Sequence, residues 1–150
     1  MKKTWVFSVM IVFLAALTAV GCTAEQSSAT PQEPQTKTID VSYDDLLNQE
    51  FITRDITLAV GDTLKVTLAS NASTGFSWTA QTQIGDSAIV QQTDHESAGP
   101  AAAMPGASGT EVWTFTALKA GTTTIATDYN QPWPGGTKRA WTFKANVTVQ

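Results

Sequence analysis

Residues 71–78 read NASTGFSW and separate two stretches of alternating apolar residues. Leu64, Val66 and Leu68 alternate with other residues before this segment, and Phe76 and Trp78 alternate after it. The polar part of the segment is made of residue types that favour tight turns. The pattern therefore predicts a strand, a short polar loop over residues 71–75 and a second strand.

The same period-two alternation recurs along the chain from Thr38 onward, between turn signals such as Gly61-Asp62 and Pro134-Gly135-Gly136. The only helix that we expect is a short one around Asp44–Gln49. Strands with one apolar face must stack as two sheets to bury those faces. With a single cysteine in the sequence, residues 38–150 are predicted to form an all-β, immunoglobulin-like antiparallel β-sandwich without a disulfide. The alternating stretches are Ile39–Tyr43, Ile56–Val60, Trp113–Ala117, Ile125–Tyr129 and Trp141–Val149, and the aromatic core candidates are Phe76, Trp78, Trp113, Phe115, Trp141 and Phe143.

The N-terminus has the layout of an export signal. Lys2 and Lys3 precede an uncharged apolar run that ends at Gly21, directly before the lone Cys22. This ending resembles the lipobox of bacterial lipoproteins. We expect a signal peptide over 1–21, a lipidated Cys22 with a flexible tether over 22–37, and a protein anchored to a bacterial outer membrane or cell surface. The alternative is an uncleaved membrane helix, since the run is close to the spanning minimum of ~17 residues.

Composition argues against several classes of function. Of 9 basic side chains, 7 remain without Lys2 and Lys3, against 13 acidic ones, a net charge of −6. An acidic exported protein is a poor candidate for binding nucleic acid. His95 is the only histidine, which excludes a multi-histidine metal site and leaves a serine triad without a well-placed base. A carboxylate pair for sugar hydrolysis stays open. We expect a binding protein without a metal or cofactor, and not an enzyme.

A long segment over 85–109 lacks periodicity and is rich in small residues. Segments of this length without secondary structure are uncommon in compact domains unless they are functional or disordered. We expect its first part, 85–103, to be a mobile loop and its end, 104–109, to be a binding loop.

A third candidate loop, over 129–136, carries Trp133 between Pro132 and Pro134. A tryptophan held in this way offers a large apolar surface at low entropic cost, as interface anchors do. The alternative is that Trp133 plugs one end of the sandwich. In an immunoglobulin-like sandwich alternate loops emerge at the same end, so this loop, 71–75 and 104–109 are predicted to form one wedge.

The three loops together resemble chagasin-type inhibitors of papain-like cysteine peptidases. The family pattern is Asn-Pro-Thr-Thr-Gly-Tyr/Phe-x-Trp, then Gly-x-Gly-Gly, then Arg-Pro-Trp; this chain has NASTGFSW at 71–78, GASGTE at 106–111 and YNQPW at 129–133. Ala72, Ser73, Ser108 and Gln131 depart from that pattern. We expect Ala72 to loosen its loop and weaken binding, and Gln131 to remove a cation.

The resemblance implies a monomeric, reversible, non-covalent inhibitor of a papain-like cysteine peptidase. Thr74 would fill the active-site cleft, Met104 and Pro105 would enter the substrate-side subsites, and Trp133 would pack on the primed side. The alternative is an adhesion or carbohydrate-binding immunoglobulin-like surface lipoprotein, with Trp133 stacked on a sugar ring. The predicted peptidase-binding residues are Asn71, Ala72, Ser73, Thr74, Gly75, Met104, Pro105, Gly106, Ala107, Ser108, Gly109, Gln131, Pro132 and Trp133.

Overall fold

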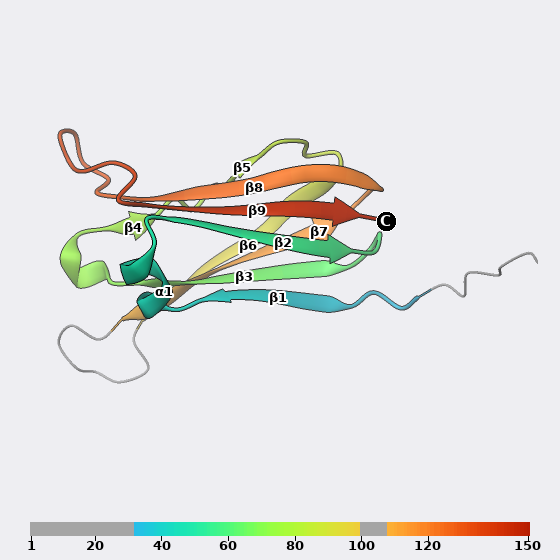
Figure 1. Ribbon diagram of the computed structural model, residues 1–150, viewed down its shortest axis with the longest axis horizontal. Coiled ribbons are helices and arrows are strands. Elements are labelled where there is room, and N and C mark those ends of the chain that lie inside the picture. Colours follow the sequence, from blue (N-terminus) through green and yellow to red (C-terminus); the bar gives the residue numbers. More distant parts are fainter. Residues whose placement is uncertain (1–31, 100–107) are drawn as a thin grey trace, which may run out of the picture. The chain divides into compact units, whose positions relative to one another are not determined.

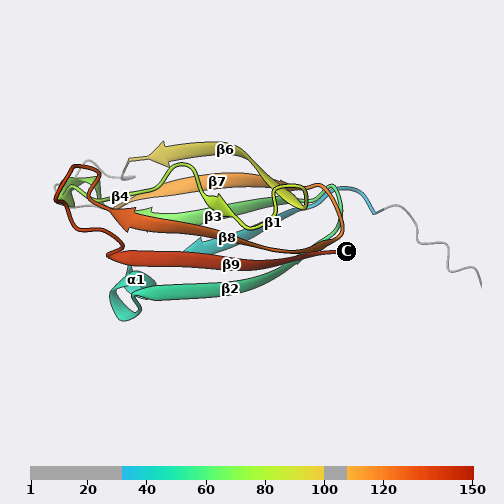
Figure 2. The same cartoon turned by 90° about the horizontal axis from the view of Figure 1, so that it is seen from above.

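The computed structural model describes residues 32–99 and 108–150, which form two stacked β-sheets (Figures 1 and 2). The four-stranded sheet has the order β1-β3-β7-β6, and the five-stranded sheet has the order β2-β9-β8-β4 with β5 paired to β8. This arrangement confirms the predicted all-β, immunoglobulin-like sandwich. The elements are β1 (Thr36–Val41), α1 (Tyr43–Asn48), β2 (Phe51–Leu58), β3 (Thr63–Ser70), a 3₁₀ turn (Ala72–Thr74), β4 (Ser77–Trp78), β5 (Gln83–Ile84), β6 (Val90–Ala98), β7 (Gly109–Ala117), β8 (Gly121–Asn130) and β9 (Trp141–Val149).

The alternating apolar residues form the core between the two sheets. Leu64, Val66 and Leu68 are buried on β3, opposite Trp113 and Phe115 on β7. Each large apolar side chain buried in this way contributes about 1.5–3 kcal/mol relative to an exposed one. The predicted aromatic core is confirmed, with the difference that Phe76 and Trp141 are only partly buried and pack against the core from one end; the fully or nearly fully buried members are Trp78, Trp113, Phe115 and Phe143.

Two strand pairs are parallel rather than antiparallel. β1 runs parallel to β3, and β2 runs parallel to β9. Both kinds of pair alternate with period two, so the sequence pattern does not distinguish them. β1 begins at Thr36, two residues before the expected start of the domain, and the Gln35 amide already donates to Asp62 Oδ1 at 2.9 Å. The expected short helix is present as α1, whose first turn is closed by a capping box between Ser42 and Asp45.

The prediction of a mobile loop over 85–103 is wrong for residues 90–98, which form β6, while residues 100–103 lie outside the described residues. This strand lies at the edge of the four-stranded sheet and pairs with β7, with a bulge between Gln92 and Asp94. Most of its residues are polar and exposed, as is common for edge strands that avoid pairing with other chains. The strand therefore lacks the apolar alternation that revealed the others.

Cys22, the expected signal peptide over 1–21 and most of the expected tether lie outside the described residues. In the part of the chain that the structure describes, no helix is long and apolar enough to cross a membrane.

Candidate functional site

The loops that carry the three motifs leave the sandwich at the same end. Ser70, the last residue of β3, pairs with Gly109 at the start of β7, so the loop after β3 begins beside the segment that precedes β7. Ser77 pairs with Asn130, which brings the end of that loop beside the loop between β8 and β9. Figure 1 shows the connection between β3 and β4 and that between β8 and β9 at the left end of the sandwich. We call residues 71–76 the first loop and residues 131–140 the third loop.

Only part of the second motif can be placed. Met104, Pro105, Gly106 and Ala107 lie outside the described residues. Ser108 is exposed and Gly109 opens β7. A Cβ on Gly109 would overlap the carbonyl oxygen of Ala98, so glycine is required there by the close approach of β6.

The first loop is a single 3₁₀ turn closed by its own hydrogen bonds. Asn71 caps it: its Oδ1 accepts from Ser73 N at 3.2 Å and from Ser73 Oγ at 2.5 Å. Thr74 Oγ1 donates to the Asn71 carbonyl at 2.6 Å, and Gly75 N donates to the Ala72 carbonyl at 3.1 Å. These bonds hold the turn with alanine at position 72, and Thr74, the last residue of the turn, is exposed.

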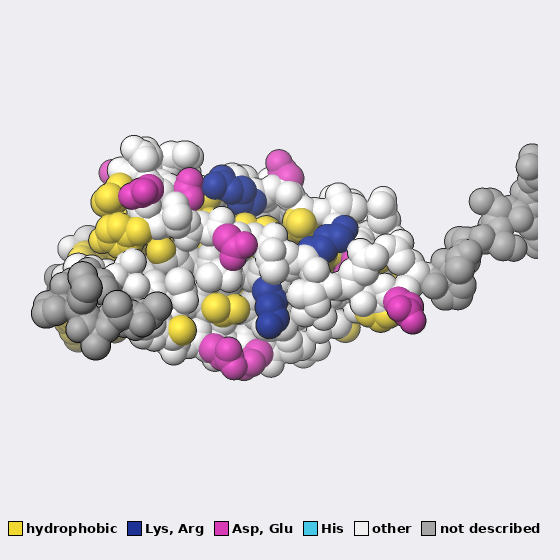
Figure 3. Space-filling view, turned by 90° about the horizontal axis from the view of Figure 1, so that it is seen from below, with side chains coloured by type: hydrophobic (Ala, Val, Ile, Leu, Met, Phe, Trp, Pro, Cys, Tyr) yellow, Lys and Arg dark blue, Asp and Glu magenta, His cyan; other side chains and the backbone are white. Residues whose placement is uncertain are grey.

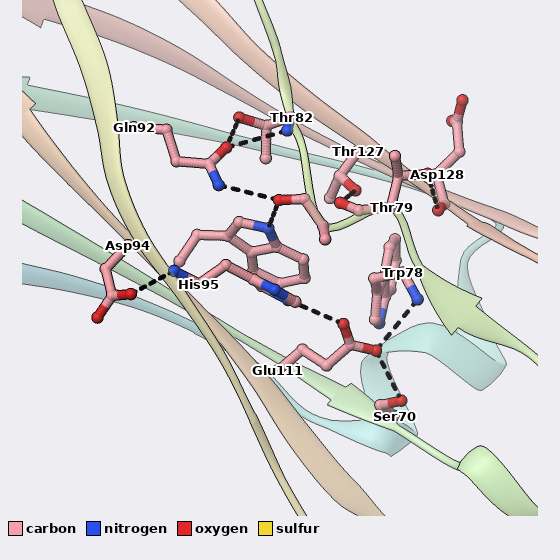
Figure 4. Close-up of polar contacts among 12 residues, drawn as sticks. Ser70, Trp78, Thr79, Thr82, Gln92, Asp94, His95, Glu111, Thr127 and Asp128 are labelled. Atoms are coloured by element: carbon pink, nitrogen blue, oxygen red, sulfur yellow. Dashed lines mark hydrogen bonds and ion pairs between the residues drawn. The ribbon is translucent and has the colours of Figure 1, made fainter.

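The base of the first loop is fixed by two residues, Tyr129 and Glu111, to which the sequence analysis gave no role in the site. The Asn71 amide donates to the Tyr129 hydroxyl at 2.9 Å. Glu111 Oε1 accepts from Ser70 Oγ and from the Trp78 amide, both at 3.1 Å (Figure 4). Glu111 could have been noticed in the sequence, because it occupies a core-facing position in the alternation of β7, where an acidic residue is unusual.

Gly75 brings the first and third loops into contact. It adopts a positive φ of 76°, and a Cβ built on it would lie only 2.7 Å from Cη2 of Trp133. Trp133 itself is 46% exposed. The alternative that Trp133 plugs the end of the sandwich is therefore wrong, and the side chain lies on the surface against the first loop.

The third loop is closed across its base by Gln131. The Gln131 amide donates to the Thr137 carbonyl, and Gln131 Oε1 accepts from the Thr137 amide, both at 2.9 Å. Lys138 Nζ donates to the carbonyls of Gln131 and Trp133. Gln131 thus holds the loop together from within, and a cation is still present beside Trp133, supplied by Lys138. Pro132 is exposed next to Trp133.

An aromatic groove of about 270 Å³ lies beside the first loop and was not predicted. It is lined by Tyr43, Thr74, Phe76, Tyr129, Ala140 and Trp141. Phe76 stacks on Tyr129 at 5.4 Å between ring centroids, Tyr129 stacks on Trp141 at 4.9 Å, and Tyr43 meets Trp141 edge-on at 5.7 Å. Figure 3 shows hydrophobic side chains gathered at this end of the molecule. The end that carries the loops therefore presents an apolar groove beside an exposed polar turn.

The chemistry of this end is that of binding. Among residues 32–99 and 108–150 there is no cluster of three or more His, Cys, Asp or Glu side chains that could hold a metal ion. His95 is paired with Glu111 at 3.1 Å, and its ring packs at a tilt against Trp113, with 4.8 Å between ring centroids. This end of the β-sandwich presents a short turn in contact with an exposed tryptophan.

A β-sandwich that presents loops at one end is a common architecture of binding proteins. Comparison with known proteins gives the family: residues 57–147 match the sequence profile described as Chagasin family peptidase inhibitor I42. Chagasin from Trypanosoma cruzi is 32% identical over 82 residues, which cover 53% of this chain and 74% of chagasin. The chain belongs to the chagasin family of peptidase inhibitors. It is an inhibitor and not an enzyme.

Solved structures support the same fold. The cysteine protease inhibitor EhICP2 from Entamoeba histolytica is similar with a TM-score of 0.62 and 19% identity, covering 79% of this chain and 99% of EhICP2. PbICP-C, solved in complex with falcipain-2, is similar with a TM-score of 0.59 and 21% identity, covering 76% of this chain and 99% of PbICP-C.

Proposed function

We propose that this protein inhibits papain-like cysteine peptidases reversibly and without a covalent bond, by placing the three loops in the active-site cleft. The observation that carries the proposal is the contact between Gly75 and Trp133, which joins two of the three family motifs into one exposed surface. The relatives agree with this target class: EhICP2 is described as a cysteine protease inhibitor, and PbICP-C was solved with falcipain-2.

The geometry of the first loop supports binding without cleavage. Thr74 is exposed while its hydroxyl is tied to the Asn71 carbonyl, so its direction is set before binding. Ordering a loop in advance reduces the entropic penalty of association. The peptide bonds of residues 72–74 lie in a 3₁₀ turn and are not extended as the scissile bond of a bound substrate is. The loop therefore blocks the cleft without serving as a substrate.

The test is titration of the full chain, purified in mild detergent, against papain and a lysosomal cathepsin. We expect an inhibition constant in the micromolar range or below. Trp133→Ala should weaken inhibition by about 2 kcal/mol, or ~30-fold, if Trp133 is a central anchor. The matched control is Val60→Ala, which also removes an exposed apolar side chain but at the turn between β2 and β3. Absence of inhibition by the wild-type protein would reject the proposal, and binding of a polysaccharide that depends on Trp133 would favour the carbohydrate alternative.

We also propose that the protein is exported and anchored through a lipidated Cys22. Support comes from the sequence before Cys22 and from the register of β1: Thr36 pairs with Thr63, at the end of β3 away from the first loop. A tether that enters at this end leaves the binding loops accessible. Cys22→Ser should move the protein from the membrane fraction to the soluble fraction, whereas retention would indicate an uncleaved membrane helix. A monomeric mass in size-exclusion chromatography is expected.

A further inference from the structure

We infer that Glu111 is a positioning residue for inhibition, which fixes the first loop in its binding conformation through hydrogen bonds at both ends of that loop. The inference rests on the proposed function. Among the described residues, the hydrogen-bond partners of the Glu111 side chain are Ser70, Trp78 and His95, none of which we assign to the peptidase surface, and the side chain is 6% exposed. It acts through the residues that it holds.

The hydrogen bonds of Glu111 join the two strands from which the first loop emerges. Ser70 ends β3 in the four-stranded sheet, and Trp78 belongs to β4 in the five-stranded sheet. Both donate to the same oxygen, Glu111 Oε1, at 3.1 Å. The first loop crosses from one sheet to the other, and this one oxygen fixes the distance between its two ends. Figure 4 shows the carboxylate between the two donors.

A third donor completes the arrangement and extends it toward the second motif. Glu111 Oε2 lies 3.1 Å from His95 Nε2 on β6, the strand that leads to residues 99–108. The His95 ring packs at a tilt against Trp113, and the His95 backbone amide donates to Asp94 Oδ1 at 2.9 Å. A carboxylate has no proton to donate and can accept several hydrogen bonds. It is thus suited to a point where three donors converge, and such charge-assisted bonds are roughly twice as strong as neutral ones.

A buried carboxylate with these bonds could serve the stability of the fold alone, and the chain contains a control for that role. Asp62 is also buried, at 1% exposure, and its carboxylate accepts from the amides of Gln35 and Ala59 at 2.9 and 2.8 Å. It lies before β3, at the end of the sandwich away from the loops. Both acids are buried and both accept from the backbone, Asp62 from two amides and Glu111 from one, and they differ in position. If these carboxylates serve only stability, replacing either acid should destabilise the protein without changing inhibition. If Glu111 positions the first loop, only its replacement should also weaken inhibition.

The experiment compares Glu111→Leu, Glu111→Gln and Asp62→Asn in the full chain, with the inhibition constant against papain and the melting temperature measured for each. Glu111→Leu removes the acceptor for Ser70 and Trp78, and we expect the inhibition constant to rise about tenfold or more. Glu111→Gln keeps an amide oxygen at the same place, and its inhibition constant should stay within about threefold of wild type, as a rescue by the conservative change. Asp62→Asn should lower the melting temperature and leave the inhibition constant unchanged.

Two results would overturn the inference. One is a Glu111→Leu protein that melts earlier, like Asp62→Asn, yet inhibits as well as wild type. The other applies if the Glu111→Leu protein does not fold. Ser70→Ala then replaces it, because this variant removes only the hydrogen bond at the start of the loop, and we expect its inhibition constant to rise about threefold. An unchanged inhibition constant for Ser70→Ala would contradict the inference.

A separate readout covers the case in which the proposed function fails. Hydrogen exchange of the Thr74 and Gly75 amides, which donate within the turn, reports loop order without a peptidase. Exchange should become faster in Glu111→Leu and not in Asp62→Asn. If wild type inhibits no papain-like peptidase but this difference appears, the proposed function is rejected while the positioning of the loop by Glu111 stands; equal exchange in all variants rejects the positioning.

Discussion

Replacing Gly75 by alanine should disconnect the first loop from the third without unfolding the protein. Gly75 has a φ of 76°, and a Cβ there would lie 2.7 Å from Trp133 Cη2 and 3.3 Å from Cζ3. Carbon atoms not bonded to each other are normally about 3.5–4.0 Å apart, so the indole ring must move by about 1 Å or more. Trp133 is 46% exposed and can swing outward.

Two separate energies follow from this geometry. The left-handed backbone costs an alanine about 1–2 kcal/mol, which appears as lost stability. The displaced indole ring loses its place in the binding surface, and loss of a central tryptophan anchor costs about 2 kcal/mol or more of binding, equivalent to ~30-fold in the inhibition constant.

Gly61→Ala is the matched control. Gly61 has a φ of 92°, and the atom nearest to a Cβ at this position would be Pro34 Cγ at 3.7 Å, an ordinary contact. Both variants should lose similar stability in denaturant titration, because both place an alanine at positive φ. Only Gly75→Ala should weaken inhibition of papain. In a Trp133→Ala background, Gly75→Ala should have much less further effect on the inhibition constant, because the clashing ring is gone.

Either of two findings would refute this reasoning. Equal inhibition constants for Gly75→Ala and Gly61→Ala would mean that the contact with Trp133 does not matter for binding. Strict additivity of Gly75→Ala and Trp133→Ala would mean that the two residues act independently.

Three further predictions concern single positions. Ala72→Pro places proline at the first position of the 3₁₀ turn, where its fixed φ suits the turn; we expect about 0.4–1 kcal/mol of added stability and a lower inhibition constant, measured by thermal melting and papain titration. Hydrogen bonds, led by that from the Gln35 amide, hold the pKa of Asp62 below its ordinary value. The ionised carboxylate therefore stabilises the fold at pH values above the ordinary aspartate pKa, and this contribution is lost as the pH falls through the lowered pKa of Asp62. The difference in melting temperature between wild type and Asp62→Asn should accordingly narrow in acid. Gly109→Ala, whose Cβ would overlap the Ala98 carbonyl oxygen, should destabilise the protein through the shift of β6, measured by denaturant titration, with ~1–3 kcal/mol typical of an overpacked site.

The sequence predicted the strands that have alternating apolar residues and the turns that have turn-forming residues. Leu64, Val66 and Leu68 are buried as their spacing predicted, and the loop at 71–75 lies between two strands. Trp133 is exposed, as its flanking prolines indicated. In each case a local pattern carries the information, because alternation and turn residues act over a few positions.

The features that the sequence did not reveal depend on partners far away in the chain. β6 is a polar edge strand, and its pairing with β7 has no local pattern. Glu111 acquires its role from Ser70 and Trp78, which lie 41 and 33 residues away. The parallel direction of β1 is likewise a matter of topology and not of composition.

That parallel pairing has a mechanical consequence for the anchored form of the protein that we propose. Thr36 pairs with Thr63 and Val41 pairs with Leu68, so β1 starts at the end of β3 opposite the first loop. Tension between the start of β1 and a peptidase bound at the loops pulls these neighbouring strands in opposite directions along their axes. The load is then shared in shear by the whole ladder, and the strands do not unzip one hydrogen bond at a time. An inhibitor fastened by a tether could thus restrain a bound peptidase without losing its first strand.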